Sequence, residues 1–504
     1  MEVNLVVVVD AIKIKRILKK IFIIAAILFF GKITAQQDSI KAYKKRVLET
    51  IEVDFLASYY EQNGDNASVT GGIGNEFLTD VASSIIISLP LNADDVLTID
   101  AGISAYTSAS SSNGNPFDAT GASGNGYDYD DYDDDDDDDD KSSAILASTT
   151  GSPWVASSGA SKSDEWSTIN ADYSHTSDDR NFSWNANASF SSEYDYTSVG
   201  FGGGFLKQFN EKNTSFGLNA KVYLDNWSPI YPTELKSFKL VNGDLSQGFF
   251  KGITILDQNG NASTNWKPLS GNFNIIQDNA RNTYSASLSF SQIISENAQI
   301  SLFMDIVNQQ GWLANPLQRV YFKDVANYYI GNASSIQNYT SKSNKDVFQL
   351  ADDIERLPNS RFKTPIGMRF NYYINETFVL RTYYRYYFDD WGLQSHTASL
   401  EMPIKVSDKF TLYPSYRFYT QTAADYFAPF DQHLSTDKYY TSDNDLSAFN
   451  ANQFGFGLSY TDIFAKTHLW EFGLKSIDLK YYKYDRNTTF NSNIINVAFK
   501  FVMD

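Results

Sequence analysis

The sequence lacks cysteine entirely, and it has only four histidines and five methionines among its 504 residues. Without cysteine, disulfides, thiolate metal sites, cysteine nucleophiles and an N-terminal lipid-anchored cysteine are excluded. Beyond residue 52 the chain also lacks a helical apolar period and any long apolar run, so no transmembrane helix is expected there. Basic residues are outnumbered 41 to 60 by acidic ones, and the net charge of −19 argues against nucleic acid as a partner.

Motifs of familiar catalytic chemistry are missing as well. The sequence has no GxSxG, no HExxH and no phosphate-cradling loop. His396 alternates onto the same side of its segment as Ala398 and Leu400, and no serine of that segment shares this side. A neighbouring strand could supply such a nucleophile, but nothing in the sequence points to one. We therefore expect that the protein is not an enzyme.

The first 35 residues have the pattern of an export signal. Lys13–Lys20 (KIKRILKK) is a basic region, Ile21–Phe30 (IFIIAAILFF) is a short apolar run, and Ala35 is a small residue at a plausible cleavage point. The apolar run is too short to span a bilayer comfortably, and an uncleaved anchor helix is the alternative. The sequence predicts a signal peptide with an N-terminal extension over residues 1–35, followed by a periplasmic segment over 36–51.

What the chain does contain is an apolar residue at every second position. In Asn181–Ser191 (NFSWNANASFS) apolar side chains alternate with Ser and Asn, and in Thr283–Ser291 they alternate with serines and threonine. A soluble β-sandwich would alternate in the same way. A membrane barrel is favoured because the segments reach about nine to eleven residues or more, and because aromatics cluster at segment ends such as Tyr383–Trp391 (YYRYYFDDW). The polar side carries Ser, Asn, Gly and charge, as a wet interior would.

The alternation predicts an all-β protein, a transmembrane antiparallel up-and-down β-barrel of about 16 strands (14–18) over residues 52–504. The expected strands lie near 52–60, 81–89, 96–106, 165–175, 181–192, 195–208, 213–226, 282–294, 298–309, 361–373, 377–388, 394–405, 409–421, 452–463, 468–484 and 489–502. Long connections, 107–164, 227–281, 310–360 and 422–451, all fall on one side, and short turns on the other. Short periplasmic turns and long extracellular loops are typical of the bacterial outer membrane.

The most acidic stretch is Tyr127–Lys141 (YDYDDYDDDDDDDDK), inside the expected loop 107–164. Its charges repel one another and its flanks are rich in Ser, Gly and Asn, which predicts a disordered extracellular loop. Carboxylates are oxygen ligands for Ca²⁺ or Mg²⁺, so diffuse cation binding or docking of a partner is one hypothesis. A merely solvated loop is the other, because the Gly and terminal Glu of an EF-hand are missing. The candidate residues are Asp128, Asp130, Asp131, Asp133, Asp134, Asp135, Asp136, Asp137, Asp138, Asp139 and Asp140.

Alternation also assigns charged residues to the barrel interior, because Arg or Lys facing lipid would cost about 2–4 kcal/mol at the midplane. The early strands contribute Asp54, Asp100, Asp172 and Asp305, and the later ones contribute Lys363, Arg369, Arg381, Arg385, Lys405 and Arg417, with Glu401 among them. An acidic wall would thus face a basic wall, a device by which water-filled pores filter polar solutes. The alternative is that these charges pair across an interior plugged by loops 227–281 and 310–360, with Trp227, Trp266 and Trp312.

The sequence therefore predicts a porin-like path for small polar solutes, surrounded by outer-membrane lipid. The alternative is a non-conducting anchor or a subunit of a surface complex, whose long loops bind envelope or surface proteins or divalent cations. An open bore favours the first function and a loop-filled bore favours the second. Apart from Ca²⁺ or Mg²⁺ at the acidic loop, no cofactor is implied.

Six segments carry a likeness to other proteins. They are Asn308–Asp324 (NQQGWLANPLQRVYFKD), Glu355–Arg361 (ERLPNSR), Tyr386–Gly392 (YYFDDWG), His396–Lys405 (HTASLEMPIK), Tyr413–Pro429 (YPSYRFYTQTAADYFAP) and Lys475–Tyr484 (KSIDLKYYKY). In these segments the chain resembles an uncharacterised family of Gram-negative (Bacteroidetes-type) outer-membrane proteins, which often have an acidic stretch in the N-terminal third. The resemblance begins near residue 52 and is densest in the second half. It implies a barrel and outer-membrane residence, and no functional residue is transferred from it.

Overall fold

In the computed structural model, the described residues are 46–106, 164–193, 195–269, 273–276, 279–341, 343–344, 346–462 and 464–503. Apart from Arg46, they belong to one compact unit, Val47–Asp504. The predicted signal peptide (1–35), most of the segment 36–51, and the aspartate run inside loop 107–164 lie outside the described residues.

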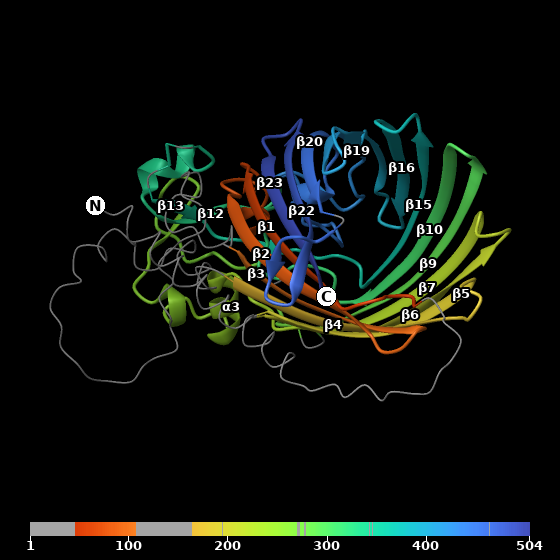
Figure 1. Cartoon of the computed structure of the whole chain (residues 1–504). Coiled ribbons are helices and arrows are strands. Elements are labelled where there is room, and N and C mark those ends of the chain that lie inside the picture. Colours follow the sequence, from red (N-terminus) through yellow and green to blue (C-terminus); the bar gives the residue numbers. More distant parts are fainter. Residues whose placement is uncertain are drawn as a thin grey trace. The chain divides into compact units, whose positions relative to one another are not determined.

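Within the described chain, sixteen long antiparallel strands close into a barrel (Figure 1), as the alternation predicts. They are β1 (Glu52–Asn63), β2 (Leu78–Pro90), β3 (Asp95–Tyr106), β4 (Asp164–Thr176), β5 (Phe182–Ser192), β6 (Tyr196–Phe209), β7 (Thr214–Trp227), β9 (Ala280–Ser295), β10 (Ala298–Gly311), β15 (Ser360–Tyr373), β16 (Val379–Asp389), β17 (Gln394–Glu401) with its continuation β18 (Ile404–Lys405), β19 (Phe410–Gln421), β20 (Phe449–Thr461), β22 (Phe472–Arg486) and β23 (Asn491–Met503). Each pairs with the next, and β23 pairs with β1 from Glu52↔Val502 to Asn63↔Asn491. The ring therefore leaves no long strand with an open edge.

Fourteen strands begin and end within three residues of their predicted bounds, and two differ in more than that. The segment expected at 394–405 is interrupted at Met402 and Pro403, because proline has no N–H to give to the ladder. The segment expected to start at 468 starts at Phe472, and His468–Leu469 forms the short strand β21, which pairs back onto β22.

The alternating sequence becomes the two faces of the wall. Phe201 of β6 stands opposite Ala188 of β5 and Val222 of β7, and it is 54% exposed. The same face carries further exposed apolar side chains around the ring, among them Ile169, Phe190, Leu224, Phe290, Leu302, Ile366, Met368, Leu400, Phe454 and Phe456. A continuous exposed apolar belt on a closed barrel is the surface that hydrocarbon covers.

Connections differ between the two ends of the barrel. At one end, which we call the short-turn rim, the turns are brief, as between β9 and β10 or between β6 and β7. At the other end, the long-loop rim, the described long connections are 228–279, 312–359 and 422–448, and β1 is joined to β2 by 64–77. Among the described residues, no helix is long and apolar enough to cross a membrane.

The four connections 64–77, 228–279, 312–359 and 422–448 pack together at the long-loop rim, and we call this assembly the loop domain. It contains α3 (Thr233–Leu240), a small sheet of β8 (Ile255–Asp257), β12 (Tyr328–Gly331) and β13 (Val347–Gln349), and the pair β11 (Arg319–Val320) and β14 (Asp353–Ile354). Figure 1 shows α3, β12 and β13 at the long-loop end. The sequence shows no helical apolar period beyond residue 52, yet α3 is a helix. Its eight residues are too few to show a helical period. Its buried residues are Glu234, Leu235 and Ser237, and the partly buried Phe238 packs against the apolar core.

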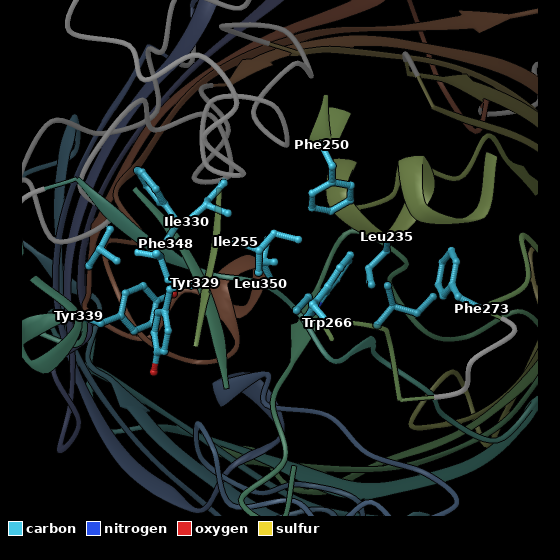
Figure 2. Close-up of a cluster of buried hydrophobic side chains, with 14 of the residues drawn as sticks. Leu235, Phe250, Ile255, Trp266, Phe273, Tyr329, Ile330, Tyr339, Phe348 and Leu350 are labelled. Carbon is cyan, nitrogen blue, oxygen red and sulfur yellow. The ribbon is translucent and has the colours of Figure 1, made fainter. Parts of the chain in front are cut away.

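The loop domain has an apolar core of its own (Figure 2). Its buried members are Tyr231, Leu235, Phe250, Ile255, Leu256, Trp266, Phe273, Tyr329, Ile330, Tyr339, Val347, Phe348, Leu350, Ala351 and Ile354. Figure 2 shows this cluster surrounded by the ribbons of the barrel strands. Of the three tryptophans expected in a plug, Trp266 is in the core, Trp312 packs against it, and Trp227 ends β7 beside Tyr196. Loops thus fold together over one mouth of the barrel.

Candidate functional site

A buried ion pair joins three connections of the loop domain. Arg319 of β11 donates from Nε to Glu234 Oε1 over 2.8 Å and from Nη2 to Oε2 over 3.1 Å. Its Nη1 donates to the carbonyl of Val69 over 3.0 Å. The Arg319 and Glu234 side chains are 2% and 0% exposed. Both groups are out of water and each compensates the charge of the other, so the pair fixes α3, β11 and the 64–77 connection to one another.

The fourth connection is attached through a second polar cluster. Tyr440 donates from its hydroxyl to Asp353 over 2.6 Å, and Arg356 pairs with the same carboxylate over 2.7 Å. His433 lies 3.0 Å from the carbonyl of Thr441 through Nε2, and burial lowers the pKa of His433. The imidazole is therefore neutral at pH 7, and Nε2 carries the proton that it donates to this carbonyl.

Two buried carboxyl groups of the loop domain hold protons near neutral pH. Glu355 is buried and accepts a hydrogen bond from the N–H of Asn315 over 2.6 Å, and burial raises the pKa of Glu355 to about 8. Asp352 accepts from the N–H of Phe322 over 2.9 Å, and burial raises the pKa of Asp352 to about 7. Burial disfavours the charged form of each group, so these acids contribute to the loop domain mainly as neutral hydrogen-bonding groups.

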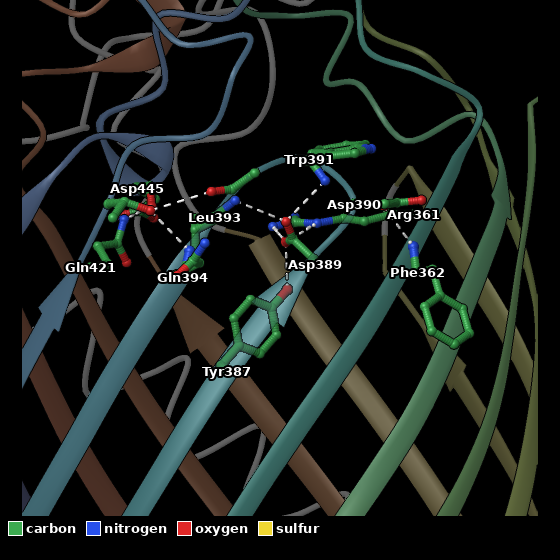
Figure 3. Close-up of polar contacts among 12 residues, drawn as sticks. Arg361, Phe362, Tyr387, Asp389, Asp390, Trp391, Leu393, Gln394, Gln421 and Asp445 are labelled. Atoms are coloured by element: carbon green, nitrogen blue, oxygen red, sulfur yellow. Dashed lines mark hydrogen bonds and ion pairs between the residues drawn. The ribbon is translucent and has the colours of Figure 1, made fainter.

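A third cluster lies where the loop domain meets the wall (Figure 3). Arg361 at the start of β15 and Asp389 at the end of β16 form an ion pair with Nη2 and Oδ2 2.5 Å apart. The carboxylate also accepts from the Tyr387 hydroxyl over 2.7 Å and from the N–H groups of Trp391 and Leu393 over 3.0 Å. The guanidinium lies 4.3 Å from the centre of the Trp391 ring. This network fixes the β16–β17 turn against β15.

The clusters draw residues from three of the six segments that carry the family resemblance. Arg319 is in Asn308–Asp324, and the ion pair Arg361–Asp389 joins Glu355–Arg361 to Tyr386–Gly392. The profile of the family described as "Protein of unknown function (DUF3570)" matches residues 19–495. The chain belongs to this family. The predicted kinship with an uncharacterised family is thus confirmed, while its Bacteroidetes origin and its acidic stretch stay predictions.

Solved structures similar to this DUF3570 chain are outer-membrane barrels. They include a bacterial polysaccharide outer membrane secretin (9% identity, TM-score 0.38, 90% of this chain and 98% of that one). A mutant of the TodX monoaromatic hydrocarbon channel (8%, 0.37, 91% and 91%) and a Pseudomonas aeruginosa FadL homologue (9%, 0.35, 90% and 90%) are also similar. Sequence identities and TM-scores as low as these say nothing about the activity of this chain. No curated protein matches the chain.

The strand register places the eleven charged residues that were predicted for the interior of this DUF3570 barrel. They lie on β1 (Asp54), β3 (Asp100), β4 (Asp172), β10 (Asp305), β15 (Lys363, Arg369), β16 (Arg381, Arg385), β17 (Glu401), β18 (Lys405) and β19 (Arg417). Most of them alternate with the exposed apolar positions of their strands, but on β1 the exposed Leu56 lies on the same face as Asp54. In the order of the ring, the acids of β1, β3 and β4 lie across from the bases of β15, β16 and β19. Asp305 differs, because β10 is the direct neighbour of β15.

Several of these charges are paired along the wall. Asp54 lies 3.6 Å from Lys500 of the neighbouring strand β23, and Arg381 lies 2.9 Å from Glu401 of β17. Lys405 lies 2.9 Å from Asp408 in the following turn, so it belongs to the short-turn rim. These contacts join neighbouring strands or one turn, and they are not pairs across the interior.

Other charges face cavities on the inner wall. One cavity of about 810 Å³ is bordered by Asp100, Trp166 and Lys480, and one of about 450 Å³ by Asp172 and Asp305. A third, of about 490 Å³, is bordered by Asp305, Arg369, Tyr383 and Arg385. The lining residues of all three come from barrel strands, so open space remains along the inner wall.

The sequence did not single out Glu234, Arg319, Glu355, Arg361 or Asp389. The quoted family segments contain all of these except Glu234, and charged residues inside them were the available signal. No group of three His, Asp or Glu that could hold a metal ion occurs among the described residues. The aspartates from Asp128 to Asp140 lie outside them, so Ca²⁺ or Mg²⁺ binding there stays a prediction.

Proposed function

We propose that this protein is an outer-membrane channel for small polar solutes, and that the loop domain gates its long-loop mouth. The observation that supports the proposal is the polar inner wall, with cavities of about 810, 450 and 490 Å³ lined by barrel strands. Acidic residues on β1, β3 and β4 across from basic residues on β15, β16 and β19 would orient a dipolar solute in transit. Such a channel carries out no enzymatic step and needs only lipid around the barrel.

The gate follows from how the loop domain is held. Its connections are joined by hydrogen bonds, apolar packing and the pair Arg319–Glu234, and the sequence has no cysteine that could lock them. A mouth closed by such contacts can open when they are exchanged for others, as in an order-to-disorder switch. The wall itself, closed by continuous hydrogen-bonded ladders, would stay unchanged.

Conductance of the purified protein in planar bilayers tests the proposal. Wild-type protein should open rarely, and Glu234→Ala combined with Phe348→Ala should open often, because both changes weaken the loop domain and leave the wall intact. Arg381→Glu with Arg385→Glu, introduced into that open variant, should shift ion selectivity towards cations. Asp408→Asn, at an exposed pair of the short-turn rim, serves as the control. Bilayers that stay silent with both wild type and the open variant would refute a channel.

A second function is supported by the separate core of the loop domain. A barrel that only anchors this domain would present it to proteins or cations outside the cell. In that case the open variant stays silent, and deletion of Asp128–Asp140 abolishes partner pull-down while the barrel still assembles.

A further inference from the structure

Two aromatic rings on the inner wall stack although a whole strand separates them. Phe303 of β10 and Tyr383 of β16 have ring centres 5.6 Å apart and planes 14° from parallel. Between them runs β15, where Gly367 pairs with Phe303. A Cβ at position 367 would lie 2.3 Å from the Phe303 ring, so only glycine leaves room for the ring above it. We call this pair of rings the aromatic ledge.

Arg369 lies against the aromatic ledge. It follows Gly367 by two residues on the same face of β15, and its guanidinium carbon is 5.5 Å from the Phe303 ring centre and 5.7 Å from that of Tyr383. Aromatic faces hold a guanidinium flat while its N–H edge stays available. Among the described residues no ion pair or hydrogen bond engages Arg369, and the side chain is exposed to the interior. The ledge thus preorganises a fork of donors without a protein acceptor.

Arg385 provides a second free donor beside the ledge. It follows Tyr383 by two residues on β16, and its guanidinium lies 5.8 Å from the Tyr387 ring centre. Its Nε is shielded from solvent and has no hydrogen-bond partner within the described part of the chain. A shielded donor without an acceptor is energetically unfavourable, and an acceptor brought by a ligand would remove this penalty.

Both arginines border the cavity of about 490 Å³, and serine, tyrosine and aspartate side chains line it as well. Ser289, Ser291 and Ser301 line it with hydroxyls, and the Oγ atoms of Ser291 and Ser301 are 2.9 Å apart. Asp305 lines it as well and would repel a dianion. The volume is in the range of small-molecule sites.

We propose that this cavity is a binding subsite for a sugar acid, a hydroxylated solute with a single carboxylate. The carboxylate would accept from Arg369 and Arg385, and the sugar hydroxyls would donate to Asp305 and exchange hydrogen bonds with the serines. This inference rests on the proposed solute path and names the class of solute. A neutral sugar would bring no negative charge to the two guanidinium groups. A phosphate dianion would be repelled by the carboxylate of Asp305.

Calorimetric titration of the detergent-solubilised protein with glucuronate tests the subsite, with glucose and inorganic phosphate as comparison probes. Glucuronate should bind more tightly than either. Arg369→Gln and Arg385→Gln should each weaken its binding about ten- to hundred-fold, as expected for loss of a charge-assisted hydrogen bond. Arg369→Lys keeps the charge but not the fork, and it should also weaken binding. Arg417 is an interior arginine of β19 that does not border the cavity. Arg417→Gln is therefore the matched control, and it should change the affinity for glucuronate less than about two-fold.

Equal binding of glucose and glucuronate, tighter binding of phosphate, or glucuronate binding unaffected by either arginine substitution would overturn the subsite. Unheated gel mobility of each variant shows that its barrel is folded. Because the titration does not depend on conductance, failure of the subsite can be distinguished from failure of the solute path. Binding to a protein that never conducts would refute the path alone, and conduction without glucuronate binding would refute the subsite alone.

Discussion

Glu355 is a buried carboxyl group of the loop domain whose ionisation is opposed by its surroundings. It is 3% exposed, and burial raises its pKa from 4.5 to about 8. Below pH 4.5 the carboxyl is protonated in the folded and the unfolded chain alike. Between pH 4.5 and about 8 only the folded chain keeps the proton, so the loop domain loses stability as pH rises through this window. Asp352, with a pKa raised to about 7, acts in the same direction.

Hydrogen exchange measures this dependence directly. After correction for intrinsic exchange rates, amides of the loop domain should be better protected at pH 5 than at pH 9. Glu355→Gln, which stays neutral at every pH, should flatten the dependence. Protection that grows with pH, or an unchanged slope in Glu355→Gln, would contradict the assignment.

Loss of the buried partner of Arg319 should be far more damaging than loss of an exposed one. Glu234→Gln leaves a guanidinium that is 2% exposed without a counter-charge, and we expect the loop domain to lose about 3–5 kcal/mol of stability. Denaturant unfolding followed by Trp266 fluorescence reports this loss. Asp408→Asn, which breaks the exposed pair with Lys405, should leave the transition unchanged. Equal effects of the two substitutions would show that the buried pair does not hold the loop domain.

At the scale of elements, the strands could be predicted because their pattern is local. Each strand meets hydrocarbon on one side and water on the other, so period two appears in every segment independently of its neighbours. The loop domain has no such pattern, because Glu234 and Arg319 meet across 85 positions and α3 is only eight residues long. Alternation could place Arg369 on the inner face, but only the register of three strands brings Phe303 and Tyr383 together over Gly367.

Charge on the outer face of a strand should block assembly, whereas the same charge on the inner face should not. Phe201→Lys puts an ammonium group among exposed apolar side chains near the middle of β6, at a cost of about 2–4 kcal/mol. Asn219→Lys, near the middle of β7 on the opposite face, is the control. Insertion into lipid vesicles, followed by protection from protease, should fall for the first variant only. Equal insertion of both variants would contradict this assignment of the faces, and a fall for Asn219→Lys alone would mean that the two faces have been exchanged.

At the scale of the whole molecule, the seam between β23 and β1 is an ordinary strand pair. Twelve residue pairs join the two strands, and the N–H of Met503 donates to the carbonyl of Ile51 over 2.9 Å. Lys500 adds an ion pair to Glu52 across the seam at 2.6 Å. The strand pairing therefore does not distinguish this seam from the other neighbouring pairs of the ring.

A circular permutant should fold because of this seam. Residue 503 joined to residue 47 by a short Gly/Ser linker, with new ends between Glu211 and Lys212 in the exposed β6–β7 turn, keeps every strand pair. We expect the heat-dependent gel mobility and the β-type circular dichroism of the parent. A permutant opened between Gly202 and Gly203, inside β6, should fail both measurements. Failure of the first permutant would mean that the seam needs its original order of synthesis.

The composition of the loop domain has a consequence for biogenesis. Its core takes residues from connections that the wall must first bring together, and Gln318 reaches Ser68 across 250 positions. Contacts of such long range form late, after the intervening chain has been ordered. Until then the aromatic side chains of the loop-domain core are exposed to water, to aggregation and to proteases. The yield of newly made protein should therefore be limited by how fast the ring closes, since nothing shelters those aromatic side chains until it does.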